Sequence, residues 1–204
     1  MLSYFCAAIL GYLLGCSNLA LYLSRTRGFD LRKTGSGNPG ASNAMVSMGW
    51  GAGVAVAAHD ILKAVAAVLL ARRFFPAAHV GELAGIACVL GHMFPVFFAF
   101  RGGKGFASYL GMLLALDWRA AAVLMVLCAV LTFLTDYIVV ATFTTVFSAP
   151  LYAFWRFGLC SALILCMGTL PILWKHRENI RRLLNGTENK FKWHINPLNT
   201  DENK

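Results

Sequence analysis

Apolar residues along the chain form long runs that short polar segments separate. The runs fall at about residues 2–23, 48–71, 78–98, 105–116, 118–135, 137–154 and 157–174. A helix needs about 20 apolar residues to cross the hydrocarbon core of a bilayer, so most of these runs are candidate spans. The fourth run is too short for a full crossing, and forms either a half-helix or a helix that extends back through 102–105. The pattern predicts an all-α polytopic membrane protein with about seven transmembrane helices, built as one domain over residues 1–204.

The composition excludes two other classes of protein. Of the 204 residues, 58% are hydrophobic and only 13% are charged, which leaves too little polar surface for a soluble globule. A disordered chain is excluded as well, because Phe, Leu, Val and Trp are abundant. The six cysteines all lie inside apolar runs, where we interpret them as small packing residues.

The basic residues predict both the orientation and the kind of partner. Lys and Arg number 18 against 9 acidic residues, and 13 of these cations fall in the loops 24–47 and 99–104 and in the segment from residue 175 onward. Positive loops stay in the cytoplasm, so we expect the N-terminus outside and the C-terminus inside, with residues 191–204 as a mobile cytoplasmic tail. Cations placed between apolar runs favour lipid head groups and anionic substrates over nucleic acid.

Three polar motifs lie in these cytoplasmic segments. The first covers residues 35–43, where three glycines and a proline prevent a regular helix and expose successive backbone N–H groups, which can bind an anion. Side-chain donors accompany them, and the following helix start adds its positive dipole end. The donors are Ser36, Asn38, Ser42 and Asn43. The alternative is a flexible surface loop.

The second motif combines cations with glycines. Gly91-His92-Met93-Phe94-Pro95 leads into Phe100-Arg101-Gly102-Gly103-Lys104-Gly105, in which two cations among glycines can approach a phosphate closely. The segment is not a Walker A loop, because Lys104 is followed by glycine. The alternative is an ordinary turn with cations at the membrane interface.

The third motif begins at His176 and includes Asn179 and Arg182. If the last span continues as a helix beyond the membrane, Lys175, Asn179 and Arg182 lie on one face, and an interfacial helix results. The alternative is a positive tail that binds anionic lipid.

Asp60 and Lys63 lie one helical turn apart inside the second run, where a charge is costly. The pair either supports a polar cytoplasmic cavity or forms a structural clasp between helices.

Several catalytic signatures are absent from the sequence: the His-x4-Asp acyltransferase signature, the Asp-Gly-x2-Ala-Arg phosphatidyltransferase motif, a Gly-x-Ser-x-Gly elbow and metal-ligand spacing.

Together the motifs resemble the acyl-phosphate:glycerol-3-phosphate acyltransferase family of bacterial membranes. The family pattern reads Gly-Ser-Gly-Asn-x-Gly-Ala-Thr-Asn, then Gly-His-x-x-Pro-x-x-x-x-Phe-Lys-Gly-Gly-Lys-Gly, then His-x-x-Asn-Ile-x-Arg-Leu. The chain carries similar segments at 35–43, 91–105 and 176–183. The resemblance extends from the first span to about residue 190, and implies seven spans with an active site on the cytoplasmic face of the bacterial inner membrane.

The resemblance implies that the 1-hydroxyl of glycerol-3-phosphate attacks a long-chain acyl-phosphate, giving lysophosphatidic acid and phosphate, the first acylation of phospholipid synthesis. Phosphate is a good leaving group, so positioning and electrostatics can supply most of the rate without a cofactor or metal ion. The implied partners are the two substrates and membrane lipid. The implied catalytic residues are Ser36, Lys104, His176 and Asn179. The implied substrate-binding residues are Gly37, Asn38, Gly40, Ser42, Asn43, Lys63, His92, Arg101, Gly102, Gly103 and Arg182.

The sequence departs from the family pattern at several positions. Val46 stands where the family usually has an arginine, Ser42 replaces threonine and Arg101 replaces lysine. A divergent copy with an altered substrate is therefore one alternative. A small organic-anion transporter is another, because charged residues inside a span suit it, but it predicts an inverted repeat that the sequence lacks.

Overall fold

The computed structural model describes residues 1–190; the tail expected over 191–204 lies outside the described residues. Within them the chain is helical and contains no strand, which confirms the all-α prediction. The helices are α1 (Leu2–Gly15), α2 (Leu19–Thr26), α3 (Ala41–Met48), α4 (Trp50–Phe74), α5 (Val80–Met93), α6 (Phe106–Leu116), α7 (Trp118–Thr135), α8 (Ile138–Phe157), α9 (Leu159–Lys175) and α10 (Arg177–Leu184). Two 3-10 turns lie at Leu31–Lys33 and Val96–Phe98.

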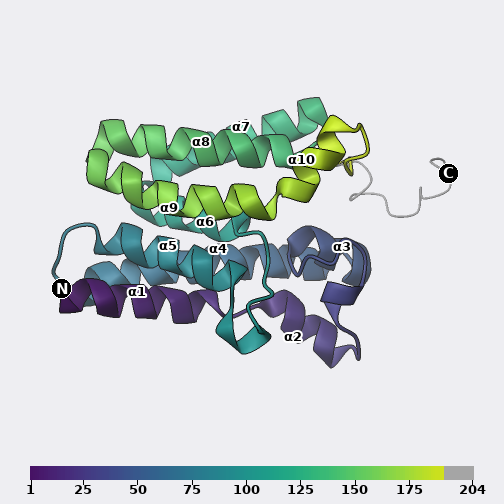
Figure 1. Cartoon of the computed structure of the whole chain (residues 1–204), viewed down its shortest axis with the longest axis horizontal. Coiled ribbons are helices and arrows are strands. Elements are labelled where there is room, and N and C mark those ends of the chain that lie inside the picture. Colours follow the sequence, from purple (N-terminus) through teal and green to yellow (C-terminus); the bar gives the residue numbers. More distant parts are fainter. Residues whose placement is uncertain (191–204) are drawn as a thin grey trace.

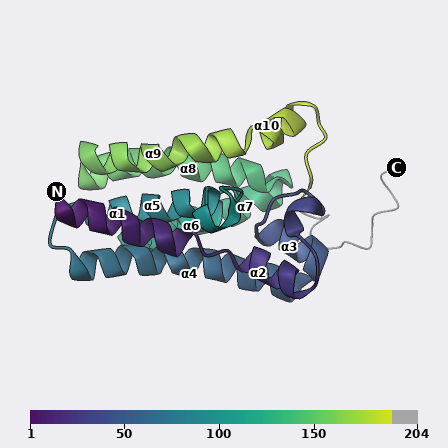
Figure 2. The ribbon, with the colours of Figure 1, turned by 60° about the horizontal axis from the view of Figure 1, so that its bottom comes forward.

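The long helices run side by side in one bundle (Figures 1 and 2). Helix α5 lies inside it and contacts α1, α4, α6 and α9, while α7 and α8 pack together on the far side of α6. The short helices α2, α3 and α10 gather at the end of the bundle opposite the N-terminus. The bundle therefore has one regular end and one end built from short helices and loops.

The predicted count of about seven spans stays a prediction, because helix length and composition alone do not fix it. Within the described residues, five segments are long and apolar enough to cross a membrane, and the pair α9 and α10 makes six if it counts as one bent span. Helix α6 is apolar but has only 11 residues. The fourth run is thus the short helix that the sequence indicated, and it does not extend back through 102–105, since α6 begins only at Phe106.

Helix breaks fall inside the first predicted run and at the start of the second. The first divides between α1 and α2, where the Asn18 side chain accepts a hydrogen bond from the backbone N–H of Leu21 and begins a new helix. Gly49, at φ 93°, separates α3 from α4. The left-handed conformation of Gly49 suits glycine because the residue has no Cβ. The helices on either side of the first loop, α2 and α3, both pack against α4.

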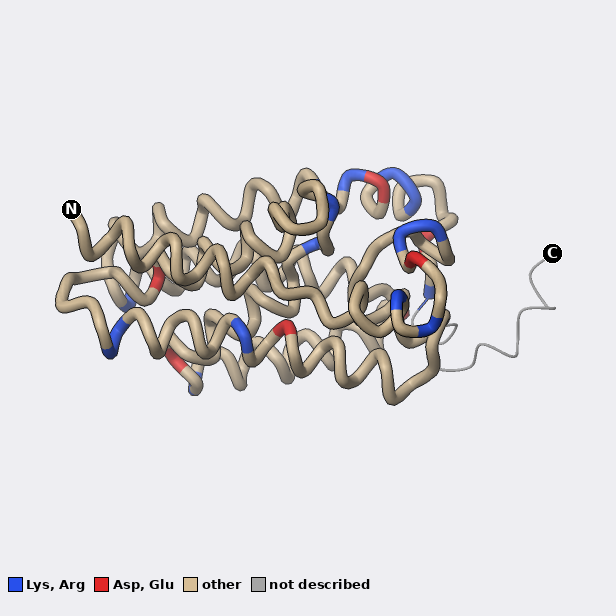
Figure 3. Tube along the Cα trace, turned by 90° about the horizontal axis from the view of Figure 1, so that it is seen from below, with Lys and Arg blue, Asp and Glu red and all other residues tan. Residues whose placement is uncertain are grey.

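Basic and acidic residues concentrate at the end formed by α2, α3 and α10 (Figure 3). This confirms that the polar motifs share one end of the bundle. Which side of the membrane that end faces stays a prediction.

Candidate active site

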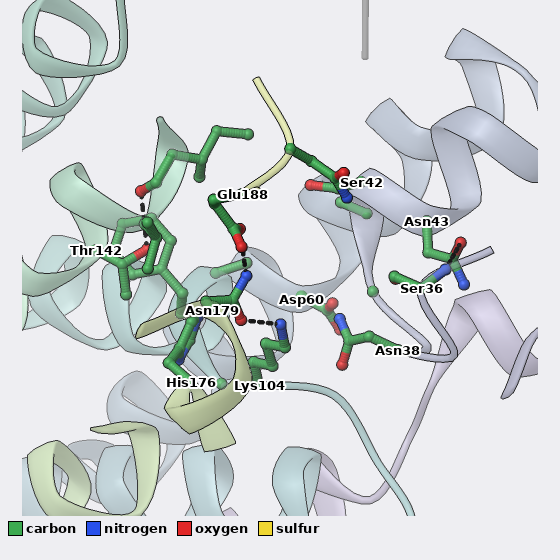
Figure 4. A pocket seen from close by; sticks show the side chains of 18 of the residues that line it. Ser36, Asn38, Ser42, Asn43, Asp60, Lys104, Thr142, His176, Asn179 and Glu188 are labelled. Carbon is green, nitrogen blue, oxygen red and sulfur yellow. Dashed lines mark hydrogen bonds between the residues drawn. The ribbon is translucent and has the colours of Figure 1, made fainter. Parts of the chain in front are cut away.

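The three motifs line one cavity at the polar end of the bundle. The first motif contributes its loop and the start of α3, the second contributes Lys104, and the third contributes residues of α10 (Figure 4). The predicted site residues on the cavity wall are Ser36, Asn38, Gly40, Ser42, Asn43, His92, Lys104, His176, Asn179 and Arg182. Ser36 and Arg182, which are 146 positions apart in the sequence, therefore line the same cavity.

The first loop is held in shape by the Asn43 side chain. Its amide nitrogen donates to the carbonyl oxygens of Leu31 (3.2 Å) and Thr34 (3.0 Å), and its amide oxygen accepts from the backbone N–H of Ser36 (3.2 Å). Asn43 is 4% exposed, so its polar atoms serve the loop itself. Gly37 has φ 69°, which favours glycine at this turn.

The loop presents polar groups to the cavity where α3 begins. Ser36 and Ser42 are exposed and Asn38 is half-buried. Gly40 is the residue before the first turn of α3, so the positive end of the helix dipole faces the cavity. An anionic group fits this arrangement.

Lys104 is the central cation of the cavity. Its amino group donates a hydrogen bond to the side-chain oxygen of Asn179 (Figure 4). Burial and the nearby Arg182 lower the pKa of Lys104 to about 8. The lysine is thus a cation with little hydration. A phosphate in the cavity can replace Asn179 as the partner of its amino group.

The third motif bends where the sequence predicted a continuous helix. Helices α9 and α10 meet at 55°, with His176 at the junction. The Nδ1 atom of His176 donates to the carbonyl oxygen of Ile172 (2.8 Å), because a carbonyl can only accept. In the neutral ring the Nε2 atom is then the acceptor. The bend turns Asn179 and Arg182 toward the cavity, while Lys175 lines a neighbouring cavity.

Glu188 is a site residue that the sequence analysis did not select. It accepts hydrogen bonds from the amide of Asn179 and from Nε of Arg182, the latter at 2.8 Å. Its side chain is 7% exposed. A lone acidic residue behind a basic helix was the signal in the sequence, but only the fold shows which cations it meets.

An apolar wall of the cavity was also missed. Phe106 and Ala107 from α6 and Ile138 and Val139 from α8 lie beside the polar groups. The cavity therefore joins cationic and polar groups to an apolar surface of the bundle.

Five predicted site residues do not line this cavity. Gly37 and Gly102 line a neighbouring cavity with Lys104. Gly103 packs against His92. Arg101 is exposed and lines none of these cavities, and Lys63 is buried beneath the site. Within residues 1–190, no three His, Cys, Asp or Glu side chains are grouped to hold a metal ion.

Comparison with known proteins decides the family. The family described as glycerol-3-phosphate acyltransferase matches residues 5–186. The chain belongs to this family. Among curated relatives, the glycerol-3-phosphate acyltransferase of Rhodopseudomonas palustris (strain BisB5) is 40% identical over 92% of this chain and 96% of its own. Glycerol-3-phosphate acyltransferase 1 of Deinococcus radiodurans is 41% identical over 91% of this chain and 94% of its own.

Solved structures of the acyltransferase family share the fold. The crystal structure of PlsY (YgiH), an integral membrane glycerol 3-phosphate acyltransferase, in its glycerol 3-phosphate form superposes with a TM-score of 0.88 at 34% identity, covering 96% of this chain and 99% of that one. Its lysophosphatidic acid form gives a TM-score of 0.84 at 33% identity, covering 95% and 98%. Membership of this family makes the chain a multi-pass membrane acyltransferase, and it favours acyl transfer over transport.

Proposed function

We propose that this acyltransferase transfers a fatty acyl group from an acyl-phosphate to the 1-hydroxyl of glycerol-3-phosphate. The hydroxyl oxygen forms a bond to the acyl carbon, and the bond from that carbon to the phosphate oxygen breaks. The hydroxyl proton leaves with inorganic phosphate, and lysophosphatidic acid is the other product. Family membership supports the acceptor, and the chemistry of the cavity supports the donor.

The observation that carries the donor is the placement of cations beside the apolar wall. Lys104 and Arg182 lie in the same cavity as Ile138 and Val139. A phosphate on the two cations would leave its acyl chain beside the apolar wall. The charge that develops on the leaving phosphate would face preorganised cations, an arrangement that stabilises a transition state.

The other polar groups suit the acceptor. The loop at 36–42 and the start of α3 offer donors for the phosphate of glycerol-3-phosphate. The Nε2 atom of His176 can accept a hydrogen bond from the attacking hydroxyl, since Nδ1 is occupied by Ile172. Asn179 orients Lys104 through its side-chain oxygen. The charge distribution supports a site on the cytoplasmic face of a bacterial inner membrane.

The test is an assay of the purified protein in lipid with glycerol-3-phosphate and palmitoyl-phosphate. We expect release of inorganic phosphate and formation of lysophosphatidic acid in equal amounts, and no product from palmitoyl-CoA. Lys104→Ala is expected to lower kcat by roughly 10²–10³, the usual effect of removing one preorganised charge-stabilising group. Turnover with palmitoyl-CoA but not with palmitoyl-phosphate would overturn the proposed donor. Activity of Lys104→Ala equal to that of the parent would remove Lys104 from the site.

A further inference from the structure

A buried polar cluster lies directly beneath the loop that carries Lys104. Asp60 and Lys63 come from α4 and His92 from the end of α5, and their exposed fractions are 2%, 7% and 3%. The Lys63 amino group lies 2.8 Å from Asp60 Oδ1 and 2.8 Å from His92 Nδ1. Charged and polar groups are costly at this depth in a membrane protein unless they are paired, so a cluster of three indicates a functional role.

The amino group of Lys63 has no proton left for a substrate. An ammonium group has three N–H donors, and Lys63 meets three acceptors: Asp60, His92 and the carbonyl oxygen of Ser17 at 2.7 Å. A charged ammonium group can only donate, so beside it His92 Nδ1 accepts and the proton of the neutral ring is on Nε2. Asp60 Oδ1 lies 3.3 Å from the same Nδ1 atom. Lys63 thus sets both the orientation and the tautomer of His92.

His92 in turn supports the glycine loop. Its carbonyl oxygen accepts from the backbone N–H of Gly103 (3.1 Å), and the carbonyl oxygen of Met93 accepts from that of Gly102 (3.2 Å). A Cβ on Gly102 would lie 2.0 Å from the His92 carbonyl oxygen, and one on Gly103 would lie 2.1 Å from His92 Nε2. Only glycines fit this close against His92, and Lys104 is the next residue.

We propose that Asp60, Lys63 and His92 are positioning residues that fix the Gly102-Gly103 loop and so place Lys104 for acyl transfer. This inference rests on the proposed function, because it assigns Lys104 the same role. The cluster acts through the loop, so Lys63 contributes without contacting either substrate. Misplacing a catalytic group by about 1 Å costs roughly 10²-fold in rate, which sets the expected loss.

The informative variant is the double substitution Asp60→Leu/Lys63→Met. Lys63→Met alone leaves the Asp60 carboxylate buried and unpaired, which disturbs folding by itself. Replacing both charges with apolar residues of similar size is often neutral for stability, so the double variant removes the support for His92 without leaving an unpaired charge. Asp60 also lines the cavity, so the hydrogen exchange of the loop, and not the rate alone, reports the loss of support. Glu82→Gln is the matched control, since Glu82 is a buried acid on α5 that pairs with His79 and Ser161 away from the site.

Two measurements test the inference in the parent, the double variant and the control. Hydrogen exchange of segment 99–105 should become faster in the double variant only, while α4 and α5 stay protected. In the assay with palmitoyl-phosphate, kcat should fall roughly 10²-fold in the double variant, with a smaller change in KM. Unchanged exchange in segment 99–105, or parental kcat in a folded double variant, would overturn the inference and leave Asp60 and Lys63 as a clasp between helices. A parent without turnover would refute the proposed function, while the exchange measurement would still decide whether the cluster holds the loop.

Discussion

At the scale of single residues, the low pKa of Lys104 gives the site a pH dependence. The amine must be protonated to balance the charge of a phosphate, and burial together with Arg182 brings its pKa down to about 8. A lysine with a lowered pKa is charged below that value and neutral above it. We therefore expect kcat/KM to be highest below pH 8 and to fall about tenfold per pH unit well above it, as measured in a pH series.

Lys104→Arg separates this lysine from other titrating groups. The guanidinium keeps its charge over the whole range, so the fall above pH 8 should disappear even if overall activity is lower. A profile that keeps the same fall in Lys104→Arg would assign the titration to another group.

Val46 is a second residue with a measurable consequence. It lines a cavity with Ser36, Asn43 and Arg182, at the position where the family usually has an arginine. A charge-assisted hydrogen bond to phosphate is worth about 1.5–3 kcal/mol. Val46→Arg is therefore expected to lower KM for glycerol-3-phosphate by roughly 10- to 150-fold, with kcat little changed. Initial rates over a range of glycerol-3-phosphate concentrations measure both constants.

Arg182 is the nearby cation that could make the expected effect of Val46→Arg fail. Its Nε atom donates to Glu188 at 2.8 Å, so part of its charge is already balanced. A raised KM in Val46→Arg would mean that Arg182 already supplies the missing cation and that a second one crowds the cavity. Val46→Leu is the control for added volume without charge.

The sequence showed which polar residues gather at the cavity better than it showed what each of them does there. Asn43 and Lys63 were both assigned to substrate binding from the motifs, yet the polar atoms of each are engaged within the protein. Asn43 holds a loop and Lys63 holds a histidine. A motif records that a polar side chain is needed, whereas only the fold shows whether its hydrogen bonds point inward or toward the cavity.

At the scale of helices, α1 and α5 touch at their backbones through glycines. A Cβ on Gly11 would lie 2.1 Å from the carbonyl oxygen of Ala84, and one on Gly15 would lie 2.1 Å from that of Cys88. Small residues spaced by four allow membrane helices to approach closely. This contact matters for the site because α5 carries His92.

Gly11→Ala is expected to destabilise the protein although alanine is the better helix former. The added carbon meets backbone atoms, which cannot rotate away, so the helices must separate, at a cost of about 1–3 kcal/mol. Thermal unfolding in one detergent measures the effect. Gly51→Ala is the control, because a Cβ there meets nothing within 4 Å. Gly51→Ala should be neutral or slightly stabilising. Equal unfolding temperatures for Gly11→Ala and the parent would contradict the close contact.

The breaks between helices were the part of the fold least open to prediction. The apolar runs located every long helix, because burial in lipid requires long apolar segments. It did not show that the chain bends by 55° at His176. That bend directs Asn179 and Arg182 to the cavity. There Asn179 meets Lys104, which lies 75 positions earlier in the chain, a contact that no local pattern records.

At the scale of the whole molecule, one topological argument foresaw the meeting of the motifs. Segments separated by an even number of crossings lie on the same side, so loops 24–47 and 99–104 and the segment after α9 were expected together. The cavity brings Ser36, Lys104 and Asn179 together as expected. Side-chain geometry within the cavity was beyond the sequence, because it depends on how far each helix is shifted along the bundle axis.

The same argument predicts the orientation of the bundle in the membrane. Cations gather at the end that holds α2, α3 and α10 (Figure 3), and positive segments resist translocation. Single cysteines at Lys33, Arg177 and Arg73, each in a protein whose six native cysteines are replaced, report the side by labelling in intact cells. We expect an impermeant reagent to label position 73 and to reach positions 33 and 177 only after the membrane is opened. Labelling of position 33 from outside would mean that the predicted orientation is reversed and that the site faces the outside of the cell.

An enzymatic assay checks the orientation independently. Glycerol-3-phosphate added outside sealed, right-side-out vesicles should give no product until the vesicles are made permeable.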